Sequence, residues 1–337
     1  MDYPWHSEAF SALLTRLDRL PHALLLRGRE GIGKLAFAEA LARAMLCEKR
    51  QPDGRACGNC VACGWVEQGS HPDFRRLEPA ILTESRAPEE EASEKKASLE
   101  IRIEQVREIA GFIAMTTHRG GAKVVLIHPA ETLNINAANA LLKNLEEPPP
   151  QTYFVLVTHR WHQLPPTIRS RCEQVVLPPP SREVARDWLE RQRLRNPELA
   201  LAQAGGAPLL ALAFDEEYWR QREALLTAIT RSGFDSLASA EHLRDTAPRL
   251  VVGWLQRWAF DLVSHKVTGE VRYNPDYVDA VAAVAARLGL VEALHYLRHM
   301  VRQQRIVSHP LNARLFLEQL LIEYGALLRQ AAPGQAA

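Results

Sequence analysis

The first half of the chain alternates short apolar runs with longer stretches of helical periodicity. Runs of this length, rich in Val, Ile, Leu, Tyr and Phe, are typical of buried strands. The predicted strands are Ala23–Leu26, Phe74–Leu77, Val124–Ile127, Tyr153–Val157 and Gln174–Leu177. The predicted helices between them are Leu35–Met45, Ile103–Ile113 and Ala137–Leu145. Strands that alternate with helices indicate a parallel sheet covered by helices.

The pattern changes after three consecutive prolines, Pro178–Pro180. Strand signals stop there, and apolar residues recur at helical spacing instead. The predicted helices are Ser181–Arg193, Trp219–Thr230, Pro248–Lys266, Tyr277–Leu288 and Leu311–Leu328. The second half is therefore predicted to be all-α.

Composition and charge narrow the class of protein. The chain has 337 residues, enough for two or three domains, and 47% of them are hydrophobic. Its net charge of +1 gives no general basic field for binding nucleic acid, although local patches remain possible. No apolar run is long enough to span a membrane, and Met1–His6 lacks the regions of a signal peptide. We expect a globular, cytoplasmic protein with no membrane partner.

Residues 83–100 form a charged segment with almost no large apolar side chain. Such a stretch cannot bury enough apolar surface to order its backbone. We predict a solvated, partly disordered insertion. The alternative is a regulatory or partner-binding segment.

The segment Gly28–Leu35 matches a phosphate-binding loop at every position but the last. It follows a predicted strand and opens a predicted helix, the context in which G-x-x-x-x-G-K-[ST] surrounds a triphosphate. Its glycines let backbone N–H groups turn toward an anion, and Lys34 would reach the outer phosphates. Leu35 stands where the motif has the hydroxyl that holds Mg²⁺, so the loop is degenerate.

A second magnesium contact is absent at the end of the predicted strand Val124–Ile127. Phosphate-loop enzymes place a metal-binding carboxylate at such a strand end, often beside a glutamate that activates water. Here the position is His128, Pro129 follows it, and Glu131 lies further along, with no evident way to substitute. Because two metal contacts are lost, we expect this chain not to hydrolyse ATP.

The retained Gly28, Gly33 and Lys34 allow two interpretations. They bind a nucleotide without hydrolysing it, or they only preserve the turn from strand to helix. We favour the second, because a triphosphate without its metal loses much of its charge neutralisation. ATP binding by this chain is therefore doubtful.

Four of the five cysteines lie close together in the sequence, which indicates a metal site in a reducing compartment. The four are Cys47, Cys57, Cys60 and Cys63. Four thiolates around one ion leave no open position, which suits structural zinc. An iron–sulfur cluster is the chemical alternative. His71 competes as the fourth ligand but is better explained by the turn before Phe74–Leu77, and Cys172 is predicted to be a buried small residue.

Two further segments are unusually specific. Asn139–Pro149 is an amphipathic helix ended by prolines, and Leu164–Cys172 lies between two predicted strands. Taken alone, Arg169 and Arg171 would be solvated surface charges. Beside a phosphate-loop fold, an arginine can instead reach a triphosphate held by a neighbouring subunit. Such arginine fingers accelerate hydrolysis by about 10³–10⁵ in GTPase systems.

Together these features resemble, almost end to end, the delta-prime subunits of the bacterial DNA polymerase III clamp loader, which are members of the AAA+ superfamily. The resemblance rests on the phosphate loop, the four-cysteine insertion after its helix, Ala140–Pro149 and the triplet Ser170–Cys172. It implies that Arg171 is the family's arginine finger and that Thr158 occupies the sensor-1 position. It also implies that Leu209 replaces the sensor-2 arginine of the hydrolysing paralogues, a third lost nucleotide contact.

The resemblance implies an α/β domain followed by all-α domains. A RecA-like AAA+ domain would span residues 1–177 and contain the zinc module at 47–63. A small helical lid would span 178–215, and an all-helical C-terminal collar would span 216–337.

The implied function is that of a non-hydrolysing stator in DNA replication. It would assemble with gamma or tau ATPase subunits and with delta, and offer Arg171 to a neighbour's ATP while the complex loads the sliding clamp onto primed DNA. The main alternative is an ATP-hydrolysing gamma/tau-type motor, against which Leu35, His128 and Leu209 argue. A zinc-dependent DNA-binding module is a second alternative, which the near-neutral charge disfavours.

Overall fold

A computed structural model of the chain describes residues 3–84, 98–118, 121–307 and 312–330. The chain divides into two units, Met1–Pro180 and Ser181–Ala337. The division follows the run of prolines at which the strand signals stop. Most of the predicted charged insertion, residues 85–97, lies outside the described residues.

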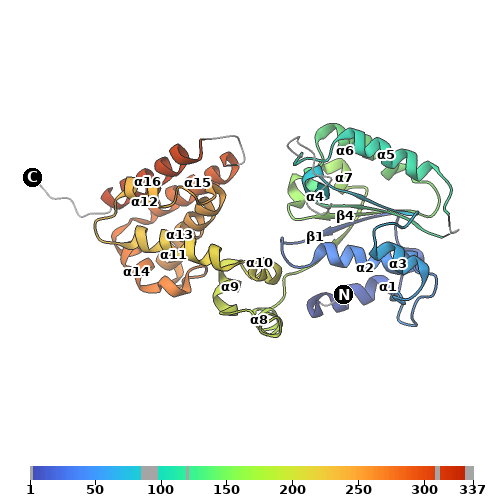
Figure 1. The fold of residues 1–337 in the computed structure, drawn as a ribbon, viewed down its shortest axis with the longest axis horizontal. Coiled ribbons are helices and arrows are strands. Elements are labelled where there is room, and N and C mark those ends of the chain that lie inside the picture. Colours follow the sequence, from blue (N-terminus) through green and yellow to red (C-terminus); the bar gives the residue numbers. More distant parts are fainter. Residues whose placement is uncertain (1–2, 85–97, 119–120, 308–311, 331–337) are drawn as a thin grey trace, which may run out of the picture. The chain divides into compact units, whose positions relative to one another are not determined.

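One parallel sheet of five strands forms the centre of the described part of the first unit (Figure 1). Its order is β2-β3-β4-β1-β5, so β1 lies between β4 and β5. The strands are β1 (Ala23–Arg27), β2 (Phe74–Leu77), β3 (Lys123–Ile127), β4 (Thr152–Thr158) and β5 (Glu173–Val176). Every residue of β3 is buried, as expected when helices cover both faces of a parallel sheet. The parallel sheet is confirmed, and each predicted strand is correct to within one residue at either end.

Helices cover both faces of this sheet (Figure 1). On one side lie α1 (Ser7–Leu14), α2 (Lys34–Leu46) and α3 (Val61–Glu67). On the other lie α4 (Ala80–Glu84), α5 (Ile103–Ala114), α6 (Ile135–Glu146) and α7 (Pro166–Arg169). Asn134 caps α6, its Oδ1 accepting the backbone N–H of Ala137 at 2.8 Å.

The described part of the second unit is entirely helical, as predicted. It begins with α8 (Arg182–Arg191), α9 (Pro197–Gln203) and α10 (Pro208–Leu212). The longer helices that follow are α11 (Glu216–Thr230), α12 (Ser236–His242), α13 (Pro248–Thr268), α14 (Val278–Arg287), α15 (Leu290–Ile306) and α16 (Ala313–Gln330). Trp254 and Trp258 of α13 are buried in the core, and Trp258 Nε1 donates a hydrogen bond to the Tyr324 hydroxyl at 3.2 Å.

A buried polar network joins α9 to the longer helices. Gln203 accepts the Tyr218 hydroxyl at 3.2 Å and donates to Asn274 Oδ1 at 3.0 Å. Arg222 Nη2 donates to the same oxygen at 2.8 Å, and the Asp261 carboxylate accepts the Asn274 backbone N–H at 2.8 Å. Breaking a buried network of this kind is costly because its groups would be left unpaired. The separation into a lid (178–215) and a collar (216–337) stays a prediction.

A search of the described helices finds none with the length and apolar character needed to cross a membrane.

Candidate functional site

The phosphate-type loop connects β1 to α2 at the carboxyl end of the sheet. Gly33 adopts φ 91°, a left-handed conformation that glycine reaches without strain. A Cβ atom on Gly28 would lie 2.4 Å from the carbonyl oxygen of Leu177, so only glycine fits there. The local backbone therefore requires glycine at both positions, whether or not a nucleotide binds.

The N-terminal segment packs onto this loop. A Cβ atom on Gly33 would lie 2.4 Å from Cδ2 of Tyr3, so the Tyr3 ring already lies against the loop. Trp5 Nε1 donates to the Ile32 carbonyl oxygen at 2.9 Å, and His6 Nε2 donates to the same oxygen at 2.6 Å. Sequence analysis missed these contacts, although the aromatic run Tyr3–His6 is a visible signal.

Lys34 is turned into its own loop. Its side chain is 2% exposed, and its ammonium group donates to the carbonyl oxygen of Arg29. Burial lowers the pKa of Lys34 to about 8, while the carboxylates of Glu131 and Glu30 act in the opposite direction. The loop thus already supplies a hydrogen-bond partner to the residue that would reach a phosphate.

The ends of β3 and β4 bring together two histidines and a buried carboxylate. His128 Nε2 lies 3.3 Å from His159 Nε2, and the Glu131 carboxylate accepts the His159 backbone N–H at 3.0 Å. Burial lowers the pKa of His159 to about 3, and the charges of Lys34 and Arg160 add to this effect. Glu131, to which sequence analysis gave no role, is one of the two carboxylates whose charges act on Lys34.

Thr158 ends β4 and is fully buried. Its hydroxyl oxygen accepts the backbone N–H of Arg160 at 3.2 Å, which orders the turn after the strand. Leu209, the position of the lost sensor-2 arginine, is the second residue of α10 in the other unit. The sensor assignments of both residues stay predictions.

The predicted metal ligands converge on one point. The sulfur atoms of Cys47, Cys57, Cys60 and Cys63 all lie within 4.8 Å of one another, and the Cys47 and Cys60 sulfurs are 3.9 Å apart. Sulfur atoms in a tetrahedral site with Zn–S bonds of about 2.3 Å lie about 3.8 Å apart. The four sulfur atoms are therefore close enough together to hold one metal ion.

Backbone N–H groups point at the same sulfur atoms. Cys57 N donates to Cys47 Sγ at 3.3 Å, Cys60 N to Cys57 Sγ at 3.3 Å and Cys63 N to Cys60 Sγ at 3.4 Å. Burial acts to raise the pKa of the Cys60 thiol, but hydrogen bonds from backbone N–H groups and from the Cys63 and Cys57 thiols outweigh it and lower that pKa to about 6. Burial raises the pKa of the Cys47 and Cys63 thiols instead. Hydrogen-bond donors stabilise thiolates, the form of cysteine that binds metals.

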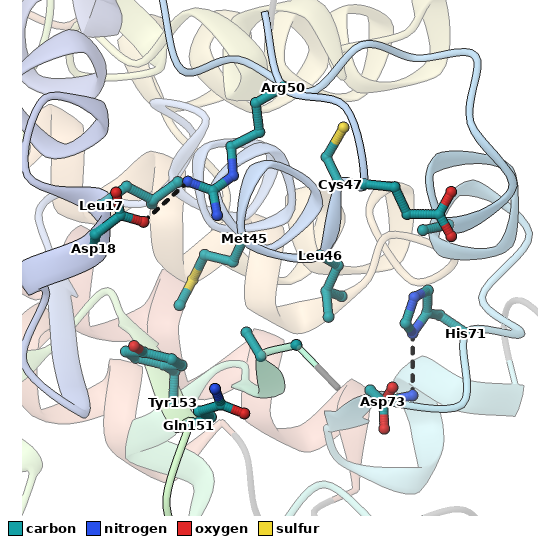
Figure 2. Close-up of a pocket in the computed structure, with 14 residues that line it drawn as sticks. Leu17, Asp18, Met45, Leu46, Cys47, Arg50, His71, Asp73, Gln151 and Tyr153 are labelled. Atoms are coloured by element: carbon teal, nitrogen blue, oxygen red, sulfur yellow. Dashed lines mark hydrogen bonds and ion pairs between the residues drawn. The ribbon is translucent and has the colours of Figure 1, made fainter. Parts of the chain in front are cut away.

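His71 lies in the turn before β2, as predicted. It lines a cavity of about 320 Å³ next to Cys47, and the backbone N–H of Asp73 donates to His71 Nδ1 at 3.0 Å (Figure 2). On another wall of the same cavity, Arg50 forms an ion pair with Asp18 at 3.2 Å. Among the described residues, only the four cysteines form a cluster suited to a metal.

Arg171 lies at the surface with three partners, one of which is the Ser170 hydroxyl, 3.4 Å from Nη1. Its side chain is 33% exposed, forms an ion pair with Glu146 and donates from Nη1 to the Thr167 carbonyl oxygen at 2.9 Å. Arg169 takes a different direction, with its guanidinium 4.9 Å from the centre of the Trp161 ring. Cys172 is buried, and burial raises the pKa of its thiol to about 12, so it is an unreactive thiol.

Comparison with known proteins covers both units. Residues 6–181 match the family model described as DNA polymerase III, delta subunit, and residues 216–325 match a model of the C-terminal region of the delta subunit. The DNA polymerase III subunit delta' of Pseudomonas aeruginosa is 34% identical, over 96% of this chain and 98% of that protein. The Escherichia coli subunit of the same name is 33% identical, over 95% of this chain and 94% of that protein.

A solved structure from Thermotoga maritima, of a DNA polymerase III gamma subunit-related protein, also matches. It is 20% identical, covers 95% of this chain and 99% of its own, and has a TM-score of 0.49. The family matches and the relatives at 33–34% identity lead to one conclusion. The chain belongs to the DNA polymerase III subunit delta' family.

Proposed function

We propose that this chain is a non-hydrolysing subunit of the DNA polymerase III clamp loader. It assembles with gamma or tau ATPase subunits and with delta, and it presents Arg171 to ATP bound by a neighbour. The complex as a whole then opens the sliding clamp and loads it onto primed DNA. The observation that carries the proposal is that the chain's own side chains already satisfy its phosphate-type loop.

The loop acts as scaffold in this proposal. The Tyr3 ring lies against Gly33, and Lys34 is bonded to Arg29 within the loop. A triphosphate would have to displace both contacts before meeting the loop. Leu35 would then offer no hydroxyl to Mg²⁺, and His128 is already in contact with His159. These features support a fold that is retained for its shape.

Arg171 is arranged to exchange one anionic partner for another. Glu146, 48% exposed at its side chain, now neutralises the guanidinium. A guanidinium can bridge phosphate oxygens as charge develops during hydrolysis. The hydrogen bond to the Thr167 carbonyl holds the side chain in place, so a neighbour's triphosphate need only replace Glu146. Glu146 keeps Arg171 paired until that neighbour binds.

Zinc is the metal that the cysteine cluster fits best. The Cys47, Cys57, Cys60 and Cys63 thiolates would complete a four-sulfur site with no position left for water or substrate. When bound, zinc would supply only structural cross-linking. Its effect would be to fix the segment between α2 and α3, since Cys47 follows α2 and Cys60 caps α3.

The test is ATP hydrolysis by a clamp loader reconstituted from purified subunits, with sliding clamp and primed DNA. Arg171→Ala should leave folding and assembly unchanged, and hydrolysis at the adjacent site should fall by about 10³-fold or more, as for other arginine fingers. Arg16→Ala is the matched control, because Arg16 is also a surface arginine paired to a glutamate, Glu173. Unchanged hydrolysis and clamp loading with Arg171→Ala would contradict the proposal.

The isolated chain gives a second, independent readout. We expect no ATP hydrolysis above background, with or without Mg²⁺. Hydrolysis at a motor-like rate that Lys34→Ala abolishes would instead favour the gamma/tau-type alternative.

A further inference from the structure

An exposed tryptophan lies beside two arginines at the carboxyl edge of the sheet. Trp161 follows β4 in a short 3-10 helix, Trp161–Gln163, and is 37% exposed. The Arg27 guanidinium carbon lies 4.8 Å from the centre of its ring, and that of Arg169 lies 4.9 Å away. Arg27 ends β1 and pairs in register with Thr158 of β4, so three separate segments build this cluster.

Neither guanidinium has a carboxylate or carbonyl partner in the described part of the chain. The Nε atoms of Arg27 and Arg169 are buried without a hydrogen bond. Other arginines of this unit are paired, for example Arg171 with Glu146 and Arg16 with Glu173. Contact with a ring uses the face of a guanidinium and leaves its in-plane N–H donors free. Two like charges on one ring repel each other, and an anion would relieve that repulsion.

The sequence around the ring is rich in arginine. Residues 157–172 include Arg160, Arg169 and Arg171 but no aspartate or glutamate. Arg160 forms an ion pair with the buried Glu131 carboxylate at 3.9 Å, and Arg171 pairs with Glu146. Among the described residues of this segment, the positive charge without a carboxylate partner is therefore that of Arg169. Arg27 and Arg169 together make a local positive patch in a chain whose net charge is only +1.

We propose that Trp161, Arg27 and Arg169 form a binding site for single-stranded nucleic acid. A base stacks on the exposed part of the Trp161 ring, and the two guanidinium groups contact the adjoining phosphates. An exposed aromatic ring flanked by cations is the arrangement that proteins use to hold unpaired strands without reading sequence. A duplex would not use the ring, because its bases are already stacked on one another. A free phosphate would not use the ring either.

The site is independent of the proposed role of Arg171, whose side chain pairs with Glu146 rather than with Trp161. It can therefore be tested on the isolated full-length chain, with no other subunit present. Failure of this site would leave the arginine-finger proposal untouched, and the reverse also holds.

The experiment measures fluorescence anisotropy of a labelled single-stranded DNA of about 12 nucleotides at low salt, within the usual site sizes. Wild-type chain should bind it, and Trp161→Ala should weaken binding by about 5- to 150-fold, the range for loss of one stacked base. Trp161→Phe should restore most of the affinity, because it keeps a ring. Arg27→Gln and Arg169→Gln should each lower the slope of log affinity against log salt by about 0.7.

Arg16→Gln is the matched control and should change neither affinity nor slope, since Arg16 is paired to Glu173. Thermal unfolding of every variant separates loss of binding from loss of fold, and the two arginine variants remain informative if Trp161→Ala does not fold. Absence of binding by the wild-type chain overturns the proposal, as does equal binding by folded Trp161→Ala and Trp161→Phe. Equal or tighter binding of a duplex, or full competition by millimolar inorganic phosphate or ATP, also overturns it.

Discussion

A different binding motif lies at each end of α2: the phosphate-type loop at its N-terminus and the four-cysteine cluster at its C-terminus. At its N-terminus, Lys34 and the phosphate-type loop find partners within the chain, namely the Arg29 carbonyl and the Tyr3 ring. At its C-terminus, Cys47 joins three other thiols whose sulfur atoms lie within 4.8 Å of one another. One motif is satisfied by the protein itself, whereas the other brings together donors that an ion would satisfy. The same helix therefore begins at a loop that contacts its own residues and ends at a cluster of four potential metal ligands.

The difference follows from the chemistry of the groups. A lysine ammonium can donate to any nearby carbonyl, so a loop that no longer needs phosphate can fold its lysine inward. Backbone N–H groups donate to three of the four sulfur atoms, but these bonds do not remove the repulsion between clustered thiolates, which a cation would. A degenerate sequence motif thus indicates lost chemistry only together with the contacts that replace it.

The largest expected effect comes from removing one ligand of the four-cysteine cluster at the C-terminal end of α2. Cys60→Ser should abolish metal binding, because a closed four-thiolate site loses a ligand, and structural zinc sites contribute about 10–16 kcal/mol in zinc-finger peptides. Elemental analysis should find about one zinc per wild-type chain and none in the variant. Limited proteolysis should then cut within residues 47–63.

Cys172→Ser is the control for the loss of a thiol, since Cys172 is buried away from the cluster and should leave the zinc content unchanged. If the wild-type protein is well folded without metal, the four cysteines do not need an ion. The two ends of α2 would then not differ in the way described.

Local patterns predicted most of the architecture. Strands such as Val124–Ile127 are continuous apolar runs, and the cysteine cluster depends on a C-x2-C-x2-C spacing that is visible in the sequence. The helix α15 was not predicted, because its exposed face mixes Val291, Leu294 and Val301 with arginines and blurs the apolar spacing.

Contacts between distant segments could not be predicted in the same way. Nothing in the spacing of Gly28–Leu35 indicates that Tyr3 lies against Gly33, or that Lys34 turns toward Arg29. Likewise Glu131 acts on Lys34 only because the ends of separate strands meet at one edge of the sheet. These contacts decide whether the loop is open to a nucleotide. The sequence therefore predicts that the loop exists but does not predict whether it is open or closed.

The second prediction concerns Lys34, in the phosphate-type loop at the N-terminal end of α2, and the way its burial makes the free energy of unfolding depend on pH. Lys34 has a pKa of about 8 in the folded chain, below its ordinary value of 10.5, because it is buried. Below pH 8 both states hold the proton, and the cost of burying the charge is fully present. Between pH 8 and 10.5 the unfolded state binds more protons, so stability rises with pH. Relative to Lys34→Met, the wild-type free energy of unfolding should rise by about 3 kcal/mol across this window.

Urea unfolding of both chains at several values of pH from 7 to 10.5 measures this difference. Lys143→Met serves as the control, because Lys143 is exposed on α6 and its replacement removes a lysine without removing a buried charge. A constant difference between wild type and Lys34→Met would mean that Lys34 is not buried as a cation, and that the loop end is more open than the structure indicates.

The smallest expected effect concerns Tyr3, whose ring lies against Gly33 of the phosphate-type loop. Tyr3→Ala should lower the free energy of unfolding by about 1–3 kcal/mol, because it removes a half-buried ring packed on Gly33. ATP binding should strengthen when the ring is removed, since a phosphate would then compete only with the Lys34 bond to Arg29. Hydrolysis should stay absent, because Leu35 and His128 are unchanged.

Tyr3→Phe keeps the ring and should match wild type in a titration with ATP and Mg²⁺. If Tyr3→Ala and Tyr3→Phe bind ATP equally, the ring does not close the loop. Any failure to bind or hydrolyse ATP would then have to come from Lys34 and from Leu35 and His128.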